Sequence, residues 1–321
     1  MLGLEAKIMF ERQWRNSVFD WKSMLLGLKR RYFRREFDFV CRAVLQTPAV
    51  ELDESSNLVV LSQSYRKDLL MYLIAAKTFA RYVRPSRFVV VDDGYTAEDQ
   101  AIIRAHLRQV DFIPRKSISS SICPTGGCWE RLLTIADVCD DQYVIQLDSD
   151  TVTVADPVEV RECIARQASF TLSTKQGRNF IPVAQAAAAV AKSQNKHIQV
   201  LAEQALGRIP ELAGSFYIRG CAGFAGFAPS AIDREAVERI SDQMSKAVGA
   251  EAWKSWGSEQ FASNYLVANS PSKMLLPFER YPYWELGGSA SIPRLIHFIG
   301  DNRFTSSAYK DIAMSALKSL R

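Results

Sequence analysis

Short apolar runs alternate with helix-like segments in the first half of the chain, and this alternation constrains the fold more than any other feature. The runs are Leu58–Ser62, Phe88–Val91 and Tyr143–Leu147. Unbroken hydrophobicity of this length is typical of strands that are buried on both faces. The segments with helical character are 69–82, 99–110 and 129–138. We therefore predict an α/β protein with an open, mainly parallel sheet and helices on both faces.

The second half of the chain continues with fewer strands and more helix. Residues 178–212 look helical and rich in alanine, and residues 231–268 look mostly helical. An apolar stretch with three glycines spans 216–227, a late strand spans 295–300, and a short helix spans 307–320. We find no repeats and no long linker. We predict a helical extension at 1–50 and one α/β domain at 51–321, with a helical insertion at about 178–212.

The net charge of +5 comes from one end of the chain. The whole protein has 40 Lys and Arg against 35 Asp and Glu, and residues 1–50 hold ten basic and five acidic side chains. The remaining residues are balanced. A nucleic-acid binder would carry a broader basic surface, so we predict no nucleic-acid partner.

The basic N-terminal segment is predicted to be an amphipathic helix from about residue 5 to 45. On a helical wheel one arc is apolar, with Leu25, Leu26, Tyr32, Phe33, Phe37 and Val40. The opposite arc is basic, with Arg30, Arg31, Arg34 and Arg35. Two interpretations stay open: a helix packed on the domain with a solvated basic face, or a helix whose residues 22–40 lie on an anionic membrane surface.

Cysteine content and hydropathy favour a cytoplasmic protein. Six cysteines are few for a disulfide framework in a chain of 321 residues, and Cys123 and Cys128 lack partners at zinc-like spacing. No stretch approaches the ~20 apolar residues of a membrane span, and no signal-peptide layout is seen. We expect free thiols, and a location in the cytoplasm or at the inner face of the membrane.

Paired carboxylates stand at the ends of two predicted strands. Asp92 and Asp93 follow one strand, and Asp148 and Asp150 follow another. In an open α/β sheet, ligands bind beyond the carboxyl ends of the strands. We expect Asp148 and Asp150 to point the same way from extended chain. Two converging carboxylates repel each other unless a cation lies between them, and oxygen ligands suit Mg²⁺ or Mn²⁺. This pattern predicts a metal site that would bridge to nucleotide phosphates.

With these motifs, the chain resembles the GT-A glycosyltransferases, in particular the retaining family 8 type related to glycogenin and bacterial galactosyltransferases. The resemblance covers roughly residues 57–305. Its motifs are VVLSQSY at 59–65, CWERLLTIADVCDDQ at 128–142, YVIQLDSDTVTVADP at 143–157, CAGFAGF at 221–227, GSEQFASN at 257–264 and HFIGDNRF at 297–304. It implies a GT-A fold, a nucleotide-sugar donor (most often a UDP-sugar) and a divalent metal.

The resemblance also implies roles for single residues. The metal ligands would be Asp148, Asp150 and His297. The donor site would comprise Ser62, Tyr65, Asp92, Asp93, Arg131, Asp148, Ser149, Gly223, Gly300 and Arg303. Two physical arguments agree with this, because a glycine lets the backbone approach a phosphate closely and an arginine grips phosphate oxygens with a planar fork. The catalytic candidates near the reacting carbon are Glu259 and Gln260.

The chain departs from the family pattern at three positions. Arg303 stands in place of a lysine, Glu259 in place of an aspartate, and Phe261 in place of a second aspartate. The predicted function is transfer of a hexose from a nucleoside diphosphate sugar to a hydroxyl of a carbohydrate or glycolipid acceptor. Retention follows from the resemblance, but inversion, with Glu259 as general base, stays open. The rival hypotheses are a sugar-1-phosphate nucleotidyltransferase and an inactive domain that binds a carbohydrate or a membrane. His106 and His197 are assigned no role.

Overall fold

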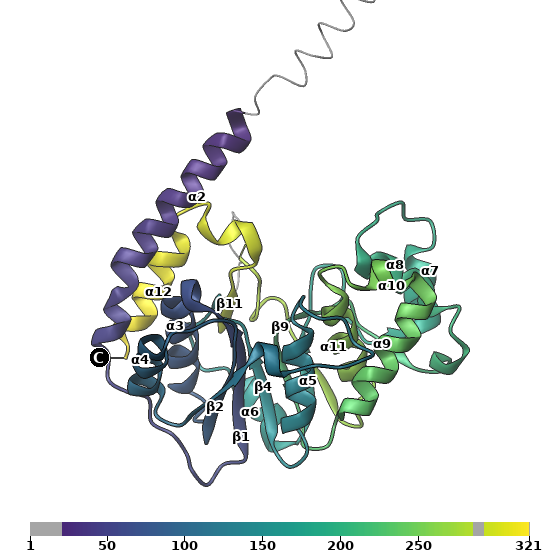
Figure 1. Ribbon diagram of the computed structural model, residues 1–321, viewed down its shortest axis with the longest axis horizontal. Helices are drawn as coiled ribbons and strands as arrows, with labels where there is room; N and C mark the ends of the chain where they lie inside the picture. Colours follow the sequence, from purple (N-terminus) through teal and green to yellow (C-terminus); the bar gives the residue numbers. More distant parts are fainter. Residues whose placement is uncertain (1–20, 285–291, 321) are drawn as a thin grey trace, which may run out of the picture.

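A seven-stranded sheet forms the centre of the computed structural model, which describes residues 21–284 and 292–320 (Figure 1). The strand order is β10-β6-β9-β4-β1-β2-β3. Their bounds are β1 Leu58–Ser64, β2 Arg87–Asp92, β3 Val110–Pro114, β4 Tyr143–Leu147, β6 Ser169–Leu172, β9 Cys221–Phe227 and β10 Lys273–Leu276. Strand β9 runs antiparallel to β4 and β6, and the other neighbouring pairs are parallel. The predicted mainly parallel α/β sheet is confirmed.

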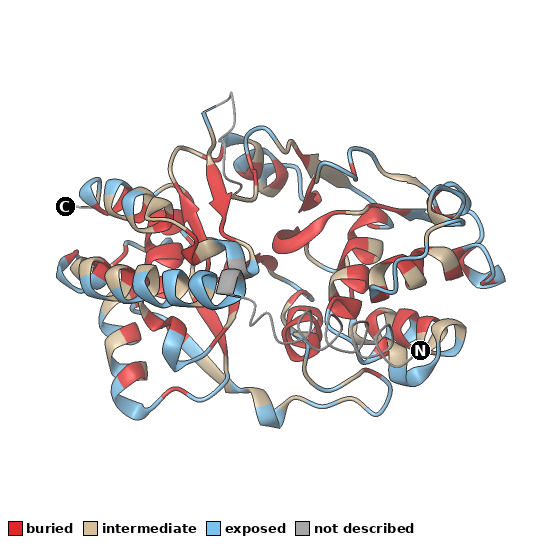
Figure 2. Cartoon of the chain, turned by 90° about the horizontal axis from the view of Figure 1, so that it is seen from above, coloured by how far each residue is buried: buried red, intermediate tan, exposed pale blue. Residues whose placement is uncertain are grey.

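Helices cover both faces of this sheet. The helices on one face include α3 (Leu69–Ala80), α4 (Ala97–Leu107) and α12 (Ala308–Lys318), and those on the other include α5 (Trp129–Val138), α9 (Arg234–Val248) and α11 (Ser258–Ala268). Along β1, Val60 packs into the first core, whereas Val59 and Leu61 pack into the second. Successive strand residues point to opposite faces, so a strand covered on both sides must be apolar throughout. Figure 2 shows the buried sheet between helices whose outer sides are exposed.

The predicted helix at 99–110 is wrong at both ends. Helix α4 starts earlier because the Thr96 hydroxyl accepts from the Asp99 amide at 3.2 Å while the Asp99 carboxylate accepts from the Thr96 amide at 2.9 Å, a capping box. Val110 belongs instead to β3, which the sequence did not predict. This edge strand is short and only partly buried, so its sequence lacks the unbroken apolar run of β1, β2 and β4.

The second half adds a helical layer and two small strand pairs. The further helices are α6 Val158–Ala165, α7 Val183–Val190, α8 Ile198–Leu206 and α10 Ala250–Trp253. The small sheets pair β5 (Thr151–Thr153) with β11 (Leu295–His297) and β7 (Ile181–Pro182) with β8 (Phe216–Tyr217). Helix α8 contacts α9 and α11. The predicted helical character of 178–212 and 231–268 is thus found, while the division of the chain at residue 50 stays a prediction.

The N-terminal helix α2 (Trp21–Val40) packs on the body through its C-terminal half. Phe37 is fully buried and lies against Phe304 and Tyr309, with ring centroids 5.7 and 4.5 Å apart. The 3₁₀ helix η1 (Cys41–Gln46) continues this contact into the same core. Residues 5–20 of the predicted helix lie outside the described residues.

The predicted wheel of α2 is partly wrong. Arg34, placed on the solvated arc, instead faces the body, where it pairs with Asp38 at 2.9 Å and Asp68 at 3.4 Å and lies over the Phe304 ring. Tyr32, placed on the apolar arc, has 63% of its surface exposed. The wheel misplaced Arg34 because it treats every cation as solvated, whereas Asp68 supplies a charge partner on the body. Tyr32 is exposed because α2 packs on the body through the side that carries Phe33 and Phe37.

The cysteines and the apolarity of the helices bear on the expected cellular location. All six cysteines have free thiols, as expected. None of the helices in the described part of the chain is both long enough and apolar enough to cross a bilayer.

Candidate active site

A tight turn after β4 carries the two aspartates. The Asp148 carbonyl accepts from the Thr151 amide at 3.2 Å and from the Thr151 hydroxyl at 2.9 Å. Asp148 and Asp150 therefore converge through a turn, and the prediction of an extended chain between them is wrong. The strand that follows, β5, pairs antiparallel with β11, and the register sets His297 opposite Thr151. This pairing brings the histidine to the aspartates from 147 residues away.

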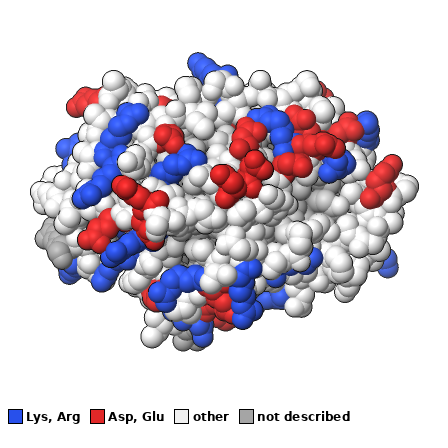
Figure 3. Space-filling view, turned by 90° about the horizontal axis from the view of Figure 1, so that it is seen from below, with Lys and Arg blue, Asp and Glu red and all other residues white. Residues whose placement is uncertain are grey.

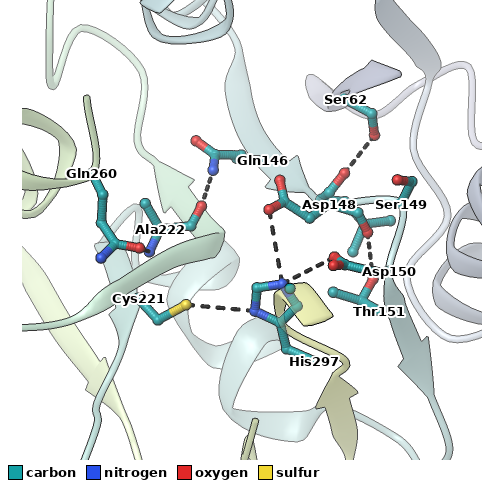
Figure 4. A network of polar contacts seen from close by, with 12 residues as sticks. Ser62, Gln146, Asp148, Ser149, Asp150, Thr151, Cys221, Ala222, Gln260 and His297 are labelled. Atoms are coloured by element: carbon teal, nitrogen blue, oxygen red, sulfur yellow. Dashed lines mark hydrogen bonds and ion pairs between the residues drawn. The ribbon is translucent and has the colours of Figure 1, made fainter. Parts of the chain in front are cut away.

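Asp148, Asp150 and His297 form a compact cluster of potential ligands (Figure 4). The imidazole Nε2 lies 3.0 Å from Asp150 Oδ1 and 3.8 Å from Asp148 Oδ2. One ligand atom from each residue lies within 4.8 Å of the others. The imidazole Nδ1 faces the sulfur of Cys221 at 3.5 Å, which leaves Nε2 directed at the carboxylates. Two carboxylates and one imidazole are a donor set that suits Mn²⁺ or Mg²⁺.

Gly223 makes room for the histidine ring. A Cβ atom at this position would lie 1.9 Å from His297 Cε1, a distance no side chain can accept. The Gly223 carbonyl accepts from the Asp148 amide at 2.9 Å. A glycine in β9 is thus required by close approach, and this residue positions one aspartate and the histidine together.

Arg131 on α5 joins the cluster to Glu259. The Arg131 guanidinium contacts the Asp148 carboxylate with one nitrogen, and another nitrogen lies 3.2 Å from each oxygen of Glu259. Arg131 and Glu259 are both buried. Burial raises the pKa of Glu259 to about 7, although Arg131 opposes the shift. Glu259 lies in the first turn of α11, where the helix dipole favours a negative charge.

Arg303 approaches the cluster from the other side. It lies on the 3₁₀ helix η5 (Gly300–Phe304), with Nη2 3.0 Å from Asp150 Oδ2 and Nε donating to the Gly300 carbonyl at 2.9 Å. Gly300 has a φ of +54°, a conformation that glycine adopts freely. Burial acts to raise the pKa of Asp150, but His297 and Arg303 outweigh it and lower that pKa. Burial keeps the pKa of Asp148 raised despite Arg131.

A cavity of about 440 Å³ opens above this cluster. Besides the charged residues, its walls include Gly220, Gly223, Gly300, Gln199, Gln260, Arg219, His197 and Trp256. Gln260 reaches the cavity from α11, where its side-chain oxygen accepts from the Ala222 amide at 3.4 Å. Trp256 has 70% of its surface exposed. The cavity thus combines a charged floor with an aromatic and amide-bearing rim.

Two of the cavity residues were missed or dismissed by the sequence analysis. His197, assigned no role, caps the N-terminus of α8 and lines the cavity. Trp256 was not singled out, although its position directly before the GSEQFASN motif at 257–264 could have pointed to it. Their placement depends on the meeting of α8 and α11, which no local motif encodes.

Several predicted donor-site residues lie outside this cavity. Ser62 is buried, and its hydroxyl donates to the Leu147 carbonyl at 2.6 Å. Ser149 is buried, and its carbonyl accepts from the Tyr309 hydroxyl at 3.3 Å. Tyr65 is 43% exposed just beyond the end of β1. Ser62 and Ser149 therefore support the turn from within, and Tyr65 offers an accessible ring at the sheet edge.

Asp92 and Asp93 differ from one another. Asp92 accepts from the Gly94 and Tyr95 amides at 2.9 and 2.7 Å and from the Gln100 side chain at 2.8 Å, so it holds the turn after β2. Asp93 is exposed and pairs with Arg115 at 2.7 Å. Of these two aspartates, Asp93 is the one whose carboxylate is open to a ligand.

A larger cavity, of about 750 Å³, lies away from the cluster. Aromatic and aliphatic side chains of Tyr82, Phe278, Trp284 and Ile312 form much of its wall. It contains neither aspartate of the cluster nor Arg131, Glu259 or Arg303. We therefore assign the chemistry to the smaller cavity, where the ionisable groups converge.

Comparisons with known proteins agree with this architecture. No model of a protein family matches the chain, and no curated protein matches its sequence. Among solved structures, glycosyltransferases are similar to this chain, and the chain has the GT-A fold, as the sequence resemblance predicts.

The individual matches are distant in sequence. The apo structure of the bifunctional glycosyltransferase WbbM matches with a TM-score of 0.51 and 14% identity over 84% of this chain and 51% of that chain, so this chain spans about half its length. The galactosyltransferase LgtC in complex with donor and acceptor sugar analogues gives 0.44 and 11%, over 80% of this chain and 95% of that one. Mouse xyloside xylosyltransferase 1, in its apo form, gives 0.42 and 11%, over 75% and 97%. At such identities the likeness shows the fold alone.

Proposed function

We propose that the protein is a metal-dependent glycosyltransferase that transfers a hexose from a nucleoside diphosphate sugar to a hydroxyl acceptor. One observation carries the proposal: Asp148, Asp150 and His297 converge in a cavity at the edge of a GT-A sheet. Ligands of open α/β sheets bind at this edge. The same cavity contains three arginines, Arg131, Arg219 and Arg303, and arginine binds phosphate oxygens well.

The residues present fit a divalent cation. Asp148, Asp150 and His297 would hold Mn²⁺ or Mg²⁺, and Gly223 leaves the ring space that this arrangement needs. A bound cation would neutralise the charge that develops on a departing diphosphate. An imidazole in the donor set favours Mn²⁺ over Mg²⁺.

The donor would lie across the sheet edge with its diphosphate on the cluster. Arg303 and the backbone at Gly300 are placed to bind phosphate oxygens, because both border the cavity beside Asp150. We propose a uridine nucleotide, whose base would stack on the accessible ring of Tyr65 and whose ribose would meet Asp93. Arg131 would hold Asp148 in position from behind.

In the reaction the bond between the anomeric carbon and the diphosphate breaks, and a bond from that carbon to the acceptor oxygen forms. The anomeric centre passes through an oxocarbenium-like state, which a nearby carboxylate or amide stabilises. Gln260 presents an amide to the cavity, and Glu259 lies behind Arg131. We propose retention from the family resemblance, with the acceptor proton passing to the departing phosphate oxygen. In the inverting alternative Glu259 would take that proton, and its pKa of about 7 suits a base.

The acceptor is proposed to be a saccharide that lies against Trp256. An exposed indole at the rim of a polar cavity offers a flat apolar surface to the face of a sugar ring. Gln199 and Gln260 stand at the same rim, with their side-chain amides 3.5 Å apart, and can donate to and accept from sugar hydroxyls. A Cβ atom at Gly257 would lie 3.1 Å from His197 Cε1, so these two lining residues are close neighbours at this side of the cavity.

The rival functions fit less well. A sugar-1-phosphate nucleotidyltransferase needs a glycine-rich phosphate loop after the first strand, but β1 is followed by Tyr65 and the 3₁₀ helix η2 (Arg66–Asp68). An inactive binding domain would not need an Asp–Asp–His cluster whose two carboxylates pair with Arg131 and Arg303. We also propose a cytoplasmic location, because free thiols are typical of proteins in a reducing compartment.

The test is hydrolysis of nucleotide sugars in the presence of Mn²⁺, with UDP-, GDP- and CDP-sugars as a panel. We expect slow release of nucleoside diphosphate from a uridine donor, and its loss in Asp150→Ala. The exposed Asp141→Ala serves as the matched control and should keep the activity. Equal background turnover in the wild type and Asp150→Ala across the panel would remove the proposal. NMR of the product anomer decides between retention and inversion.

A further inference from the structure

Helix α2 has two apolar faces, only one of which is covered. Its packed face carries Phe33 and Phe37, three to four residues apart, and continues into the buried Cys41. The opposite face carries Leu28, Tyr32 and Phe39, with exposed fractions of 52%, 63% and 81%.

The two faces lie on opposite sides of the helix. Leu28 and Tyr32 are four residues apart, and Arg35 and Phe39 repeat this spacing, so they share one side. Each packed residue lies two positions from an outward one, which turns it by about 200° around the axis. Met24 and Leu25, also about half exposed, extend the outward stripe toward the N-terminal end of α2.

Cations are interleaved with this outward stripe. Arg31 and Arg35 lie among its apolar residues, and Lys29 and Arg42 are exposed nearby. Within residues 21–284 and 292–320, no carboxylate pairs with Arg31, Arg35 or Arg42.

The two acidic residues of α2 are used elsewhere. Glu36 pairs with Lys310 at 2.6 Å, and Asp38 pairs with Arg34 at 2.9 Å. Among the described side chains of α2, those on the outward face therefore carry positive charge alone. By contrast, the underside of the molecule shows Lys and Arg beside Asp and Glu (Figure 3).

We propose that the outward face of α2 docks the protein on an anionic lipid surface. Large apolar side chains interleaved with unpaired arginines match the chemistry of such a surface, where the apolar groups enter the acyl boundary and the cations meet lipid phosphates. Protein interfaces also concentrate aromatic residues and arginine, and the test below separates a protein partner from a lipid surface. This face differs from the predicted membrane-facing arc, which included the packed residues Phe33 and Phe37.

Docking would act close to the candidate active site. Helix α2 packs on η5 through Phe37 and Arg34, and η5 also carries Arg303, which lies 3.0 Å from Asp150. Helix α2 is therefore joined through η5 to the wall of the cavity. A glycolipid acceptor in the same surface would be presented beside that cavity, a consequence that depends on the proposed function, whereas lipid binding itself does not.

The test is flotation of the full chain with vesicles of phosphatidylglycerol and phosphatidylcholine, against vesicles of phosphatidylcholine alone. We expect flotation with the anionic vesicles only, weakened by salt. Arg31→Glu combined with Arg35→Glu should reduce binding by roughly tenfold or more. The matched control, Lys192→Glu with Lys196→Glu, makes the same charge change at exposed lysines in the segment between α7 and α8 and should keep binding.

The apolar part of the face needs its own variant. Leu28→Ser with Phe39→Ser should also lose flotation, whereas Ile122→Ser, at another exposed aliphatic residue, should not. Unchanged thermal unfolding of each variant shows that folding is intact. The proposal is overturned if the wild type stays with the unbound fraction, if the Arg31 and Arg35 variant floats like the wild type, or if the Leu28 and Phe39 variant abolishes a dimer in solution while flotation is unchanged. Because no donor or metal is present, failure here leaves the proposed transferase untouched, and failure of hydrolysis leaves this result untouched.

Discussion

The cavity and the outward face of α2 both contain arginines, but the cavity arginines pair with carboxylates whereas those on the outward face are exposed. Arg131 and Arg303 are fixed by carboxylates at the floor of the cavity. On α2, Arg31 and Arg35 are exposed, with no carboxylate beside them among the described residues. Arg34, one position from Arg35, behaves like the cavity arginines because Asp68 faces it. Position relative to the body, and not residue type, decides whether a cation is part of the protein's own structure or is open to a partner.

The largest expected effect comes from breaking the paired network in the cavity. Arg131→Met removes the buried guanidinium that faces Asp148 and Glu259. The buried Glu259 and the partly buried Asp148 would then lose this partner, and we expect a loss of about 3–5 kcal/mol in the free energy of unfolding. Urea unfolding measures it. Arg31→Met is the comparison on α2, and a similar loss there would contradict the distinction between the two regions.

A pH series should show the cost of burying Glu259. The unfolded chain releases this proton near pH 4.5, whereas burial keeps it on the folded protein up to about pH 7. The unfolded state therefore binds fewer protons in this window, and stability falls by roughly 2–3 kcal/mol as the pH rises through it. Glu259→Gln should flatten that part of the curve of unfolding free energy against pH. If the slopes of wild type and variant agree between these values, the carboxyl is not held neutral by its surroundings.

Gly223→Ala should disturb the cluster through one added methyl group. Its Cβ would meet the His297 ring, and we expect a loss of about 1–3 kcal/mol in stability together with weaker Mn²⁺ binding. Both can be followed by thermal unfolding with and without Mn²⁺. If Gly223→Ala keeps the stabilisation by Mn²⁺, the His297 ring can adopt another position without loss of the metal site.

Arg34 and Arg35 are adjacent in α2, but their substitutions should differ in their effect on the free energy of unfolding. Arg34→Ala removes contacts to Asp38, Asp68 and the Phe304 ring, and we expect about 1–2 kcal/mol of destabilisation. Arg35→Ala, on the exposed side, should change stability by less than about 0.5 kcal/mol. Equal effects in chemical denaturation would mean that α2 does not pack as described.

The smallest expected effect is at Gly27, in the part of α2 that precedes its contact with the body. A Cβ there would meet nothing within 4 Å, so Gly27→Ala should favour the helix by about 0.5–1 kcal/mol. Slower amide hydrogen exchange in α2, without a change in the cavity, is the expected readout. Faster exchange there would show that the glycine is needed for a bend.

The sequence predicts the parts of this molecule that local patterns encode. The apolar runs of β1, β2 and β4 identify strands buried on both faces, and the motif at Asp148–Asp150 indicates the sheet edge at which the structure brings Asp148, Asp150 and His297 together. His297 was placed by resemblance to the family, and the pairing of β5 with β11 explains its position.

What the sequence does not predict depends on partners distant in the chain. The contact of Arg131 with Glu259 spans 128 residues, and the burial of Arg34 depends on Asp68. Trp256 reaches the cavity because α8 and α11 meet there. No helical wheel or short motif contains these relations, since each is a property of tertiary packing.

The central claim is that Asp148, Asp150 and His297 bind one divalent cation that in turn holds a nucleoside diphosphate. Electron paramagnetic resonance of Mn²⁺ added to the full chain, with and without UDP, tests it directly. We predict one bound Mn²⁺ per chain, tighter when UDP is present, and loss of that binding in His297→Ala and in Asp150→Asn while Asp141→Asn binds as the wild type does. Mn²⁺ binding that is absent in the wild type, or unchanged in both cluster variants, would contradict the account.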